Sequence, residues 1–197
     1  MKSKIYYIND FPWGRPNKFP YSQAQLEFLP ECISVRLTSV EDNIRATVDY
    51  DNGPVYKDSC LEFFFCPCPD TSEAYMNFEI NPLGSLYIGF SHDGKRSSSA
   101  AVDFCMYKEL MDIKVVREER KWCAEYKIPY VFIRKFAPDF KGIRQKRITG
   151  NFYKCGDNTL FPHYAVWKHI DTDVVKEPDF HRVEFIGDID ILNNETY

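Results

Sequence analysis

The sequence predicts an all-β protein, an antiparallel β-sandwich of the immunoglobulin or jelly-roll type with at most one or two short helices. Apolar and polar residues alternate with a period of two along many short segments, whereas long amphipathic helical patterns are nearly absent. Aromatic residues make up 16% of the chain, and their broad side chains pack well on the pleated surface of strands. With 197 residues and no repeat or linker, we expect one domain over residues 1–197.

Two strands are expected early in the chain, at residues 32–40 (CISVRLTSV) and 43–50 (NIRATVDY). In each segment every second residue is apolar, which places the apolar side chains on one face of the strand and the polar ones on the other. A turn at Glu41-Asp42 would join the two strands.

The next expected strand, CLEFFFC, is apolar on both of its faces. Alternation places Leu61, Phe63 and Phe65 on one face and Glu62 on the opposite face. A strand that is covered on both faces lies near the centre of a sheet. Glu62 therefore points away from the main core into a partly sheltered space.

Hairpins and one helix complete the expected architecture. The segment YMNFEI turns at Pro82-Leu83-Gly84 and returns as SLYIGF. Residues 112–129 form a second hairpin, with Trp122 and every second residue after it facing the core. A short helix is expected over residues 130–136, and the last strands within residues 147–157 and 181–191.

The charge and the cysteine content of the chain argue against some classes of binding partner and indicate a cellular compartment. The net charge is -4 and the isoelectric point is near 5.6, which argues against nucleic acid and against an anionic membrane surface. The N-terminal segment has no apolar run of the length of a signal peptide. Seven irregularly spaced cysteines indicate free thiols rather than a disulfide framework. We expect a cytoplasmic protein, and the oligomeric state is left open.

The polar residues near Glu62 suggest a binding face. Asn77, Glu79 and Asn81 follow one another on one face of the neighbouring strand. Carboxylates and amides can bind the hydroxyls of a neutral sugar, while aromatic rings stack on its C–H surface. The alternative is a solvated strand face on which Glu62 pairs with a surface lysine, and pattern alone does not choose between them.

Six short segments of the chain, taken together and in this order, resemble the segments of a known protein family. The chain reads YKDSCLEFFFCP, YMNFEINPLGSLY, CAEYKIPY, GNFYKCGD, HYAVWKHI and PDFHRVEFIGDI over about residues 50 to 190. Together they resemble the family-nine carbohydrate-binding modules and their stand-alone relatives. The resemblance implies a β-sandwich that binds a mono- or oligosaccharide between aromatic rings and catalyses no reaction.

The resemblance also implies a set of ligand-binding residues. Tyr56 and Trp167 correspond to the two rings of the clamp, and Glu62 to an acid that binds hydroxyls. Further candidates near the same face are Asn81, Arg96 and Asn151. The chain departs from the family pattern in having Tyr rather than the common Trp at position 56, Lys154 where Arg is frequent, and no proline in FHRVEFIG.

Two other functions remain as alternatives. Glu62 and Glu79 on adjacent strands could form the carboxylate pair of a glycoside hydrolase. A haem- or metal-binding relative of the sandwich could use Met76 or a histidine, although the histidines lack ligand spacing. Cys105, Cys123 and Cys155 belong to no nucleophile motif and are expected to be inert thiols. We expect no cofactor and no metal, with a structural calcium ion left open.

Overall fold

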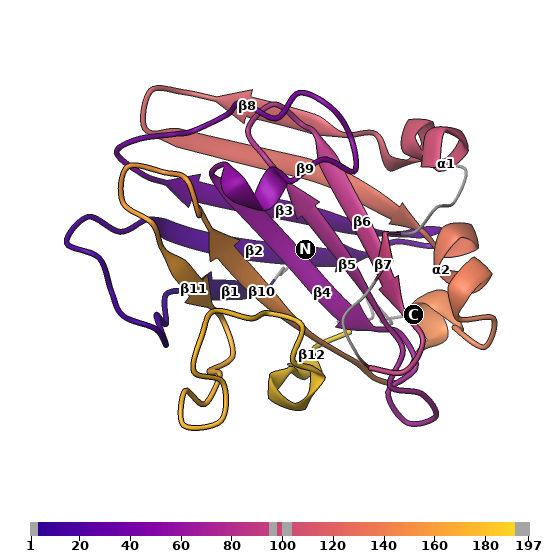
Figure 1. Cartoon of the computed structure of the whole chain (residues 1–197). Coiled ribbons are helices and arrows are strands. Elements are labelled where there is room, and N and C mark those ends of the chain that lie inside the picture. Colours follow the sequence, from indigo (N-terminus) through magenta and orange to yellow (C-terminus); the bar gives the residue numbers. More distant parts are fainter. Residues whose placement is uncertain (1–3, 95–97, 100–103, 192–197) are drawn as a thin grey trace.

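The computed structural model describes residues 4–94, 98–99 and 104–191. Two antiparallel sheets pack face to face (Figure 1), which confirms the predicted β-sandwich. The α-helices of the described residues are α1 (Phe104–Met111) and α2 (Tyr130–Phe136), as short as expected. Neither is long and apolar enough to cross a membrane, and no other helix of the described residues is.

The first sheet has five strands in the order β1-β2-β3-β9-β8. It contains β1 (Ile5–Ile8), β2 (Tyr21–Phe28), β3 (Cys32–Val40), β8 (Lys114–Arg117) and β9 (Lys121–Pro129). The predicted strand at residues 32–40 and the hairpin at 112–129 are confirmed, and alternate residues of β2, β3 and β9 are buried.

The second sheet runs in the order β11-β10-β4-β5-β6-β7, and β12 also pairs with β10. It contains β4 (Cys60–Cys66), β5 (Tyr75–Ile80), β6 (Leu86–Ser91), β7 (Ser98–Ser99), β10 (Ile148–Cys155), β11 (Tyr164–Val166) and β12 (Gly187–Ile189). Every residue of β4, β5 and β10 is buried, because the sheet is covered on both of its faces.

Two hydrophobic clusters explain this burial. The larger one lies between the sheets and includes Leu61, Phe63 and Phe65 of β4. The smaller one lies on the outer face of the second sheet and includes Phe64 of β4 and Tyr153 of β10. The predicted alternation of β4 is therefore confirmed, and the outer face of this sheet is also packed.

Residues 43–50 do not form the predicted strand. Their backbone donors bind side chains instead of a neighbouring strand. The amides of Thr47 and Val48 donate to the Asp58 carboxylate at 2.8 and 2.9 Å, and the amide of Arg45 donates to Ser59 Oγ at 3.0 Å. Side chains that offer such acceptors compete with sheet ladders, so this segment folds as a loop.

The C-terminal prediction is partly right, because residues 181–191 contain a 3₁₀ turn, η3 (Val183–Phe185), before the three residues of β12. The strands β1, β2, β7 and β11 and the helix α1 were not predicted. A further 3₁₀ turn, η1 (Val55–Lys57), precedes β4, and η2 (Gly142–Arg144) precedes β10.

Candidate functional site

The outer face of the second sheet carries two buried carboxyl groups side by side. Glu62 of β4 and Glu79 of β5 are directly opposite each other in the antiparallel register. Only 2% of Glu62 and 6% of Glu79 is exposed. Asn77, on the same face of β5, donates from Nδ2 to Glu79 Oε1 at 2.8 Å. The side chains of residues opposite each other on adjacent strands lie close together, so the two carboxyl groups share one environment.

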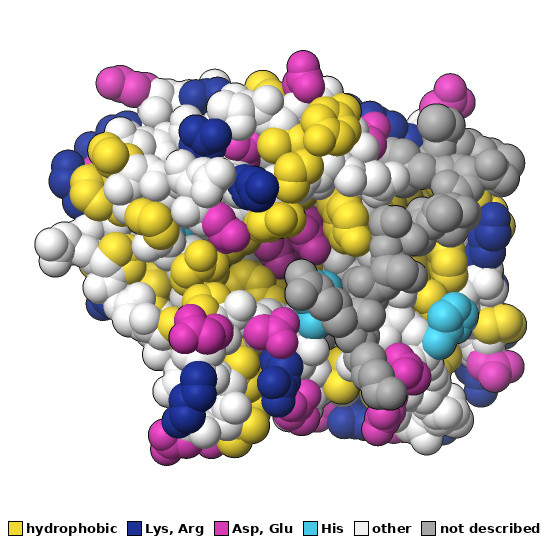
Figure 2. Space-filling model, viewed as in Figure 1, with side chains coloured by type: hydrophobic (Ala, Val, Ile, Leu, Met, Phe, Trp, Pro, Cys, Tyr) yellow, Lys and Arg dark blue, Asp and Glu magenta, His cyan; other side chains and the backbone are white. Residues whose placement is uncertain are grey.

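A cavity of about 340 Å³ opens above these two acids. Its walls come from η1, from the loop after β10, from β11 and from residues 178–181. The lining residues are Tyr56, Glu62, Phe64, Glu79, Cys155, Asp157, Tyr164, Pro178, Asp179, Phe180 and His181. A neighbouring hollow of about 300 Å³ shares Tyr56, Glu79 and His181 with it. In Figure 2, acidic and hydrophobic side chains meet in a hollow near the middle of this face.

Aromatic rings form the walls of the cavity. Phe180 stacks on the buried ring of Tyr153, with the ring centres 4.2 Å apart and the planes 11° apart. Tyr164 meets Phe180 edge-on at 6.4 Å. Tyr56 is 41% exposed, so one ring of the wall is open to a ligand. The hydroxyl of Tyr75 lies 2.8 Å from Nδ1 of His181, which orients the imidazole.

Two carboxyl groups of the cavity, those of Glu62 and Asp157, have a raised pKa. Burial, followed by the proximity of Cys155 and Glu79, raises the pKa of Glu62 well above its ordinary value. Burial also raises the pKa of Asp157, although a hydrogen bond from Tyr164 opposes this. The same burial and the nearby Asp157 raise the pKa of Tyr164 to about 12. The cavity therefore offers both donors and acceptors, as the hydroxyls of a ligand require.

The turn η1 holds Tyr56 at the rim of the cavity. The carbonyl of Tyr56 accepts a hydrogen bond from the amide of Asp157 at 3.3 Å. The carbonyl of Lys57 accepts one from the amide of Asn158 at 3.1 Å. The turn is thus attached to the loop that follows β10, and Tyr56 and Asp157 belong to one connected wall.

Asn81 and Asn151 are buried away from the cavity lining, and their amides bind the backbone. Asn81 donates from Nδ2 to the carbonyl of Val48 at 2.7 Å, and its Oδ1 accepts from the amides of Leu83 and Ser85. Asn151 donates from Nδ2 to the carbonyl of Lys168 at 2.9 Å, and its Oδ1 accepts from the Lys168 amide. Both side chains shape loops in the structure.

Trp167 lies on the other side of the sheet from Glu62. Its ring packs against Tyr6 at 4.7 Å and Phe152 at 5.8 Å, both of which belong to the cluster between the sheets. The structure therefore brings Tyr56 and Glu62 together and does not bring Trp167 to them. Arg96 lies outside the described residues.

Several lining residues were not predicted from the sequence, namely Cys155, Asp157, Tyr164, Phe180 and His181. The segment YAVW contains a signal for one of them. Val166 belongs to the outer cluster and Ala165 to the inner one, so alternation places Tyr164 outward and Trp167 inward.

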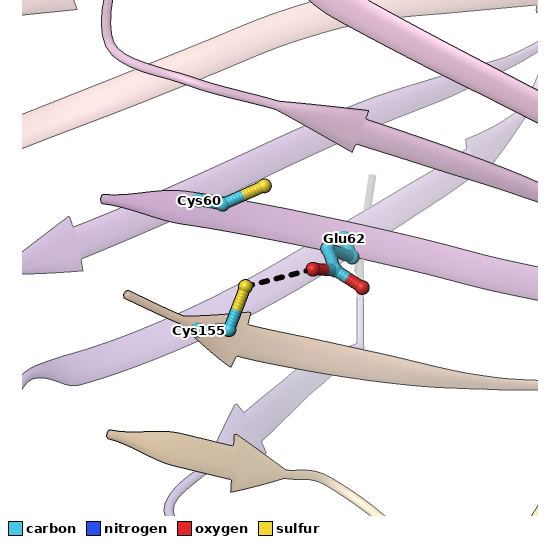
Figure 3. Close-up of side chains that lie close together, drawn as sticks. All are labelled: Cys60, Glu62 and Cys155. Carbon is cyan, nitrogen blue, oxygen red and sulfur yellow. Dashed lines mark hydrogen bonds between the residues drawn. The ribbon is translucent and has the colours of Figure 1, made fainter. Parts of the chain in front are cut away.

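Met76, which the haem- or metal-binding alternative would use, is completely buried in the core between the sheets. The histidine His163 is also buried, and burial and the nearby Lys154 lower its pKa to about 4. Among the residues that the structure describes, the group with the spacing of metal ligands is instead Cys60, Glu62 and Cys155 (Figure 3).

Comparisons with known proteins agree with the fold. The model of a family described as Carbohydrate-binding family 9 matches residues 2–191. A protein from Bacteroides uniformis ATCC 8492, whose crystal structure is described as that of a proposed carbohydrate-binding protein, has 25% sequence identity to this chain. The match has a TM-score of 0.76 and covers 94% of this chain and 85% of that one.

A family 9 carbohydrate-binding module from Caldicellulosiruptor kristjanssonii matches in two complexes. The cellotriose complex is 10% identical with a TM-score of 0.60, over 94% of this chain and 80% of that one. The glucose complex is 11% identical with a TM-score of 0.59, over 95% and 82%. The comparison with curated protein sequences gave no match.

Proposed function

The chain belongs to carbohydrate-binding family 9, and we propose that it binds a neutral sugar in the cavity above Glu62 and Glu79. The family is a non-catalytic one, so the glycoside hydrolase considered from the sequence is not adopted. Two family 9 complexes contain glucose and cellotriose, which makes these two sugars the first ligands to test.

The observation that carries the proposal is the pairing of buried acids with aromatic walls. Glu62 and Glu79 form the floor, and the rings of Tyr56, Tyr164 and Phe180 rise around it. Rings of this kind can stack on the apolar face of a sugar, and the carboxyl groups can bind its hydroxyls. In this proposal Tyr56 remains a stacking ring, and Tyr164 or Phe180 takes the place that the family resemblance implied for Trp167.

The charge of the lining favours a neutral ligand over an anionic one. The described residues that line the cavity include Glu62, Glu79, Asp157 and Asp179 and contain neither Lys nor Arg. An anionic sugar would therefore find no ammonium or guanidinium group among these lining residues to bind its charge. The volume of about 340 Å³ is at the lower end of the range for small-molecule sites. A monosaccharide, or the end of a short oligosaccharide, is therefore the proposed ligand.

Calorimetric titration with glucose, cellotriose and other neutral sugars tests the proposal. Tyr56→Ala and Glu62→Gln should each weaken binding by about tenfold or more, equivalent to about 1.4 kcal/mol. Tyr7→Ala is the matched control, because Tyr7 is an exposed tyrosine, 57% accessible, that lines the outer face of the other sheet. The proposal is wrong if no sugar of the panel binds, or if Tyr56→Ala binds as tightly as Tyr7→Ala.

A further inference from the structure

Two cysteines and an acid meet beneath the cavity. Cys60 at the start of β4 and Cys155 at the end of β10 are directly opposite each other in the register of the two strands. Glu62 is two residues further along β4 and therefore faces the same side. One ligand atom of each residue lies within 4.8 Å of the others, and the Cys155 thiol donates to Glu62 Oε1 at 2.9 Å (Figure 3).

We propose that Cys60, Glu62 and Cys155 bind one zinc-like divalent cation, with its fourth coordination position open to the cavity. Two thiolates and one carboxylate are a ligand set that suits zinc, whereas calcium and magnesium require oxygen ligands. Tetrahedral zinc with sulfur at about 2.3 Å and oxygen at about 2.0 to 2.2 Å keeps its ligand atoms about 3.3 to 3.8 Å apart. The observed limits are similar, since the Cys155 sulfur lies 2.9 Å from Glu62 Oε1 and all three ligand atoms lie within 4.8 Å of one another.

The position of the cluster supports the proposal in two ways. Glu62 and Cys155 line the cavity, so an ion in solution has a route to the site. The three groups are almost completely buried on two adjacent strands of the sheet, which holds them in place without a ligand.

A disulfide between Cys60 and Cys155 is the competing interpretation, because the residues are cross-strand neighbours. The two thiols lie close to each other, and each also has a contact with another group. Cys155 donates to the Glu62 carboxyl group, and Cys60 lies 3.9 Å from the carbonyl of Leu61. Forming a disulfide would remove the donor from a buried carboxyl group, whereas a cation would bind all three side chains.

One consequence depends on the proposed function. The same Glu62 carboxyl group would bind either the sugar or the cation, so each ligand should weaken the binding of the other. Such coupling between binding equilibria is reciprocal. The zinc-bound protein is therefore expected to bind sugar less tightly than the metal-free protein, by the factor by which sugar weakens zinc binding.

Titration of the reduced, chelator-treated full chain with Co²⁺ tests the metal site without any sugar. We expect one equivalent to bind, with the absorption bands of tetrahedral cobalt coordinated by thiolates, and Zn²⁺ to displace it. Cys60→Ser, Cys155→Ser and Glu62→Gln should each weaken binding by more than about 100-fold, beyond the effect of losing an outer-shell partner. Cys66→Ser is the matched control, since Cys66 is a buried cysteine on the same face of β4.

The outcomes are distinct. X-ray absorption at the zinc edge of the wild-type protein should show two sulfur neighbours at about 2.3 Å, a result that does not depend on the folding of any variant. Absence of a thiolate band, loss of two thiols to a disulfide without metal binding, or equal loss in Cys66→Ser would each overturn the metal site. Metal binding without sugar binding would leave the site standing and contradict only the proposed function.

Discussion

Replacing Asp58 with Asn removes the charge that holds the loop at residues 43–50 against the second sheet. The Asp58 carboxylate is completely buried. It accepts hydrogen bonds from the amides of Thr47 and Val48 at 2.8 and 2.9 Å, from the Thr47 hydroxyl at 2.8 Å and from Asn81 Nδ2 at 3.0 Å. These four groups are donors, and the Arg45 guanidinium forms an ion pair with the same carboxylate at 3.3 Å, so the site is built for a charged acceptor with two oxygens.

The size of the effect follows from these contacts. A hydrogen bond to a charged group contributes about 1.5 to 3 kcal/mol. Asn keeps one acceptor oxygen, but its NH₂ group then faces at least one of the four donors. Losing one or two of these bonds should lower the free energy of unfolding by about 3 kcal/mol. For a chain of this size that corresponds to a fall in Tm of about 6 to 12 °C.

The effect should depend on pH in one direction. Burial alone would raise the pKa of Asp58, but hydrogen bonds from Val48, Thr47 and Asn81 outweigh it and lower the pKa below its ordinary value. The unfolded chain therefore takes up a proton at a higher pH than the folded chain. The stabilisation is complete above the unfolded-state pKa of about 3.9 and is lost as the pH falls through the lower folded-state value.

Urea unfolding of the wild type and the variant, measured by tryptophan fluorescence from pH 7 down to pH 3, checks both expectations. The difference in free energy should stay constant down to about pH 5 and shrink below about pH 3.9. Asp49→Asn is the control, because it makes the same change of charge on an exposed residue of the same loop and should stay within about 0.5 kcal/mol of wild type. A loss below 1 kcal/mol in Asp58→Asn, or a difference that does not shrink in acid, would refute the reasoning.

Two other substitutions test the placement of buried side chains. Trp167→Phe should lower the free energy of unfolding by about 1 to 2 kcal/mol, because the Trp167 ring packs on Tyr6 and Phe152. The sugar affinity of this variant should stay within about twofold of wild type. A tenfold loss of affinity, measured by calorimetry, would instead place Trp167 in the binding site. Lys154→Met should cost about 3 to 5 kcal/mol in urea unfolding, because it leaves the buried carboxylate of Glu41, 3.4 Å from Lys154 Nζ, without its cation. Adding Glu41→Gln should recover part of that loss, and a double variant no more stable than Lys154→Met would contradict the ion pair.

The sequence contained most of the sheet structure, and the failures have identifiable causes. Strand β3 has three consecutive inward positions with large apolar side chains, Ile33, Val35 and Leu37, and was predicted. In β2 the inward positions include Ser22 and Ala24, and Ser22 bonds Ser39 inside the sandwich at 2.9 Å, so the hydrophobic contrast is weak. In residues 43–50 apolar and polar side chains alternate regularly, but two backbone amides of this segment donate to the Asp58 carboxylate instead of to a neighbouring strand. Periodicity describes one segment, and pairing depends on partners far away in the sequence.

In the candidate site too, features that depend on one segment could be predicted, and contacts between distant segments could not. Alternation within β4 predicts that Glu62 lies on the other face of the strand from Leu61 and Phe63, and the structure confirms it. The partners of Glu62 could not be predicted in this way, because Glu79 and Cys155 reach it through the register of two neighbouring strands. Phe180 comes from a loop without periodicity, so no local signal marks it.

The cavity has a floor made by residues of packed strands and walls made by residues of loops. The floor residues, Glu62 and Glu79, are held by strands that are packed on both faces, so substitutions there disturb the sheet itself. The walls come from η1, from the loop after β10 and from residues 178–181, where Tyr56 and Phe180 can change with less effect on the sheet. A substitution at position 56 is a change of this second kind. The ligand should therefore be decided mainly by the walls, while the floor sets the requirement for hydroxyl groups.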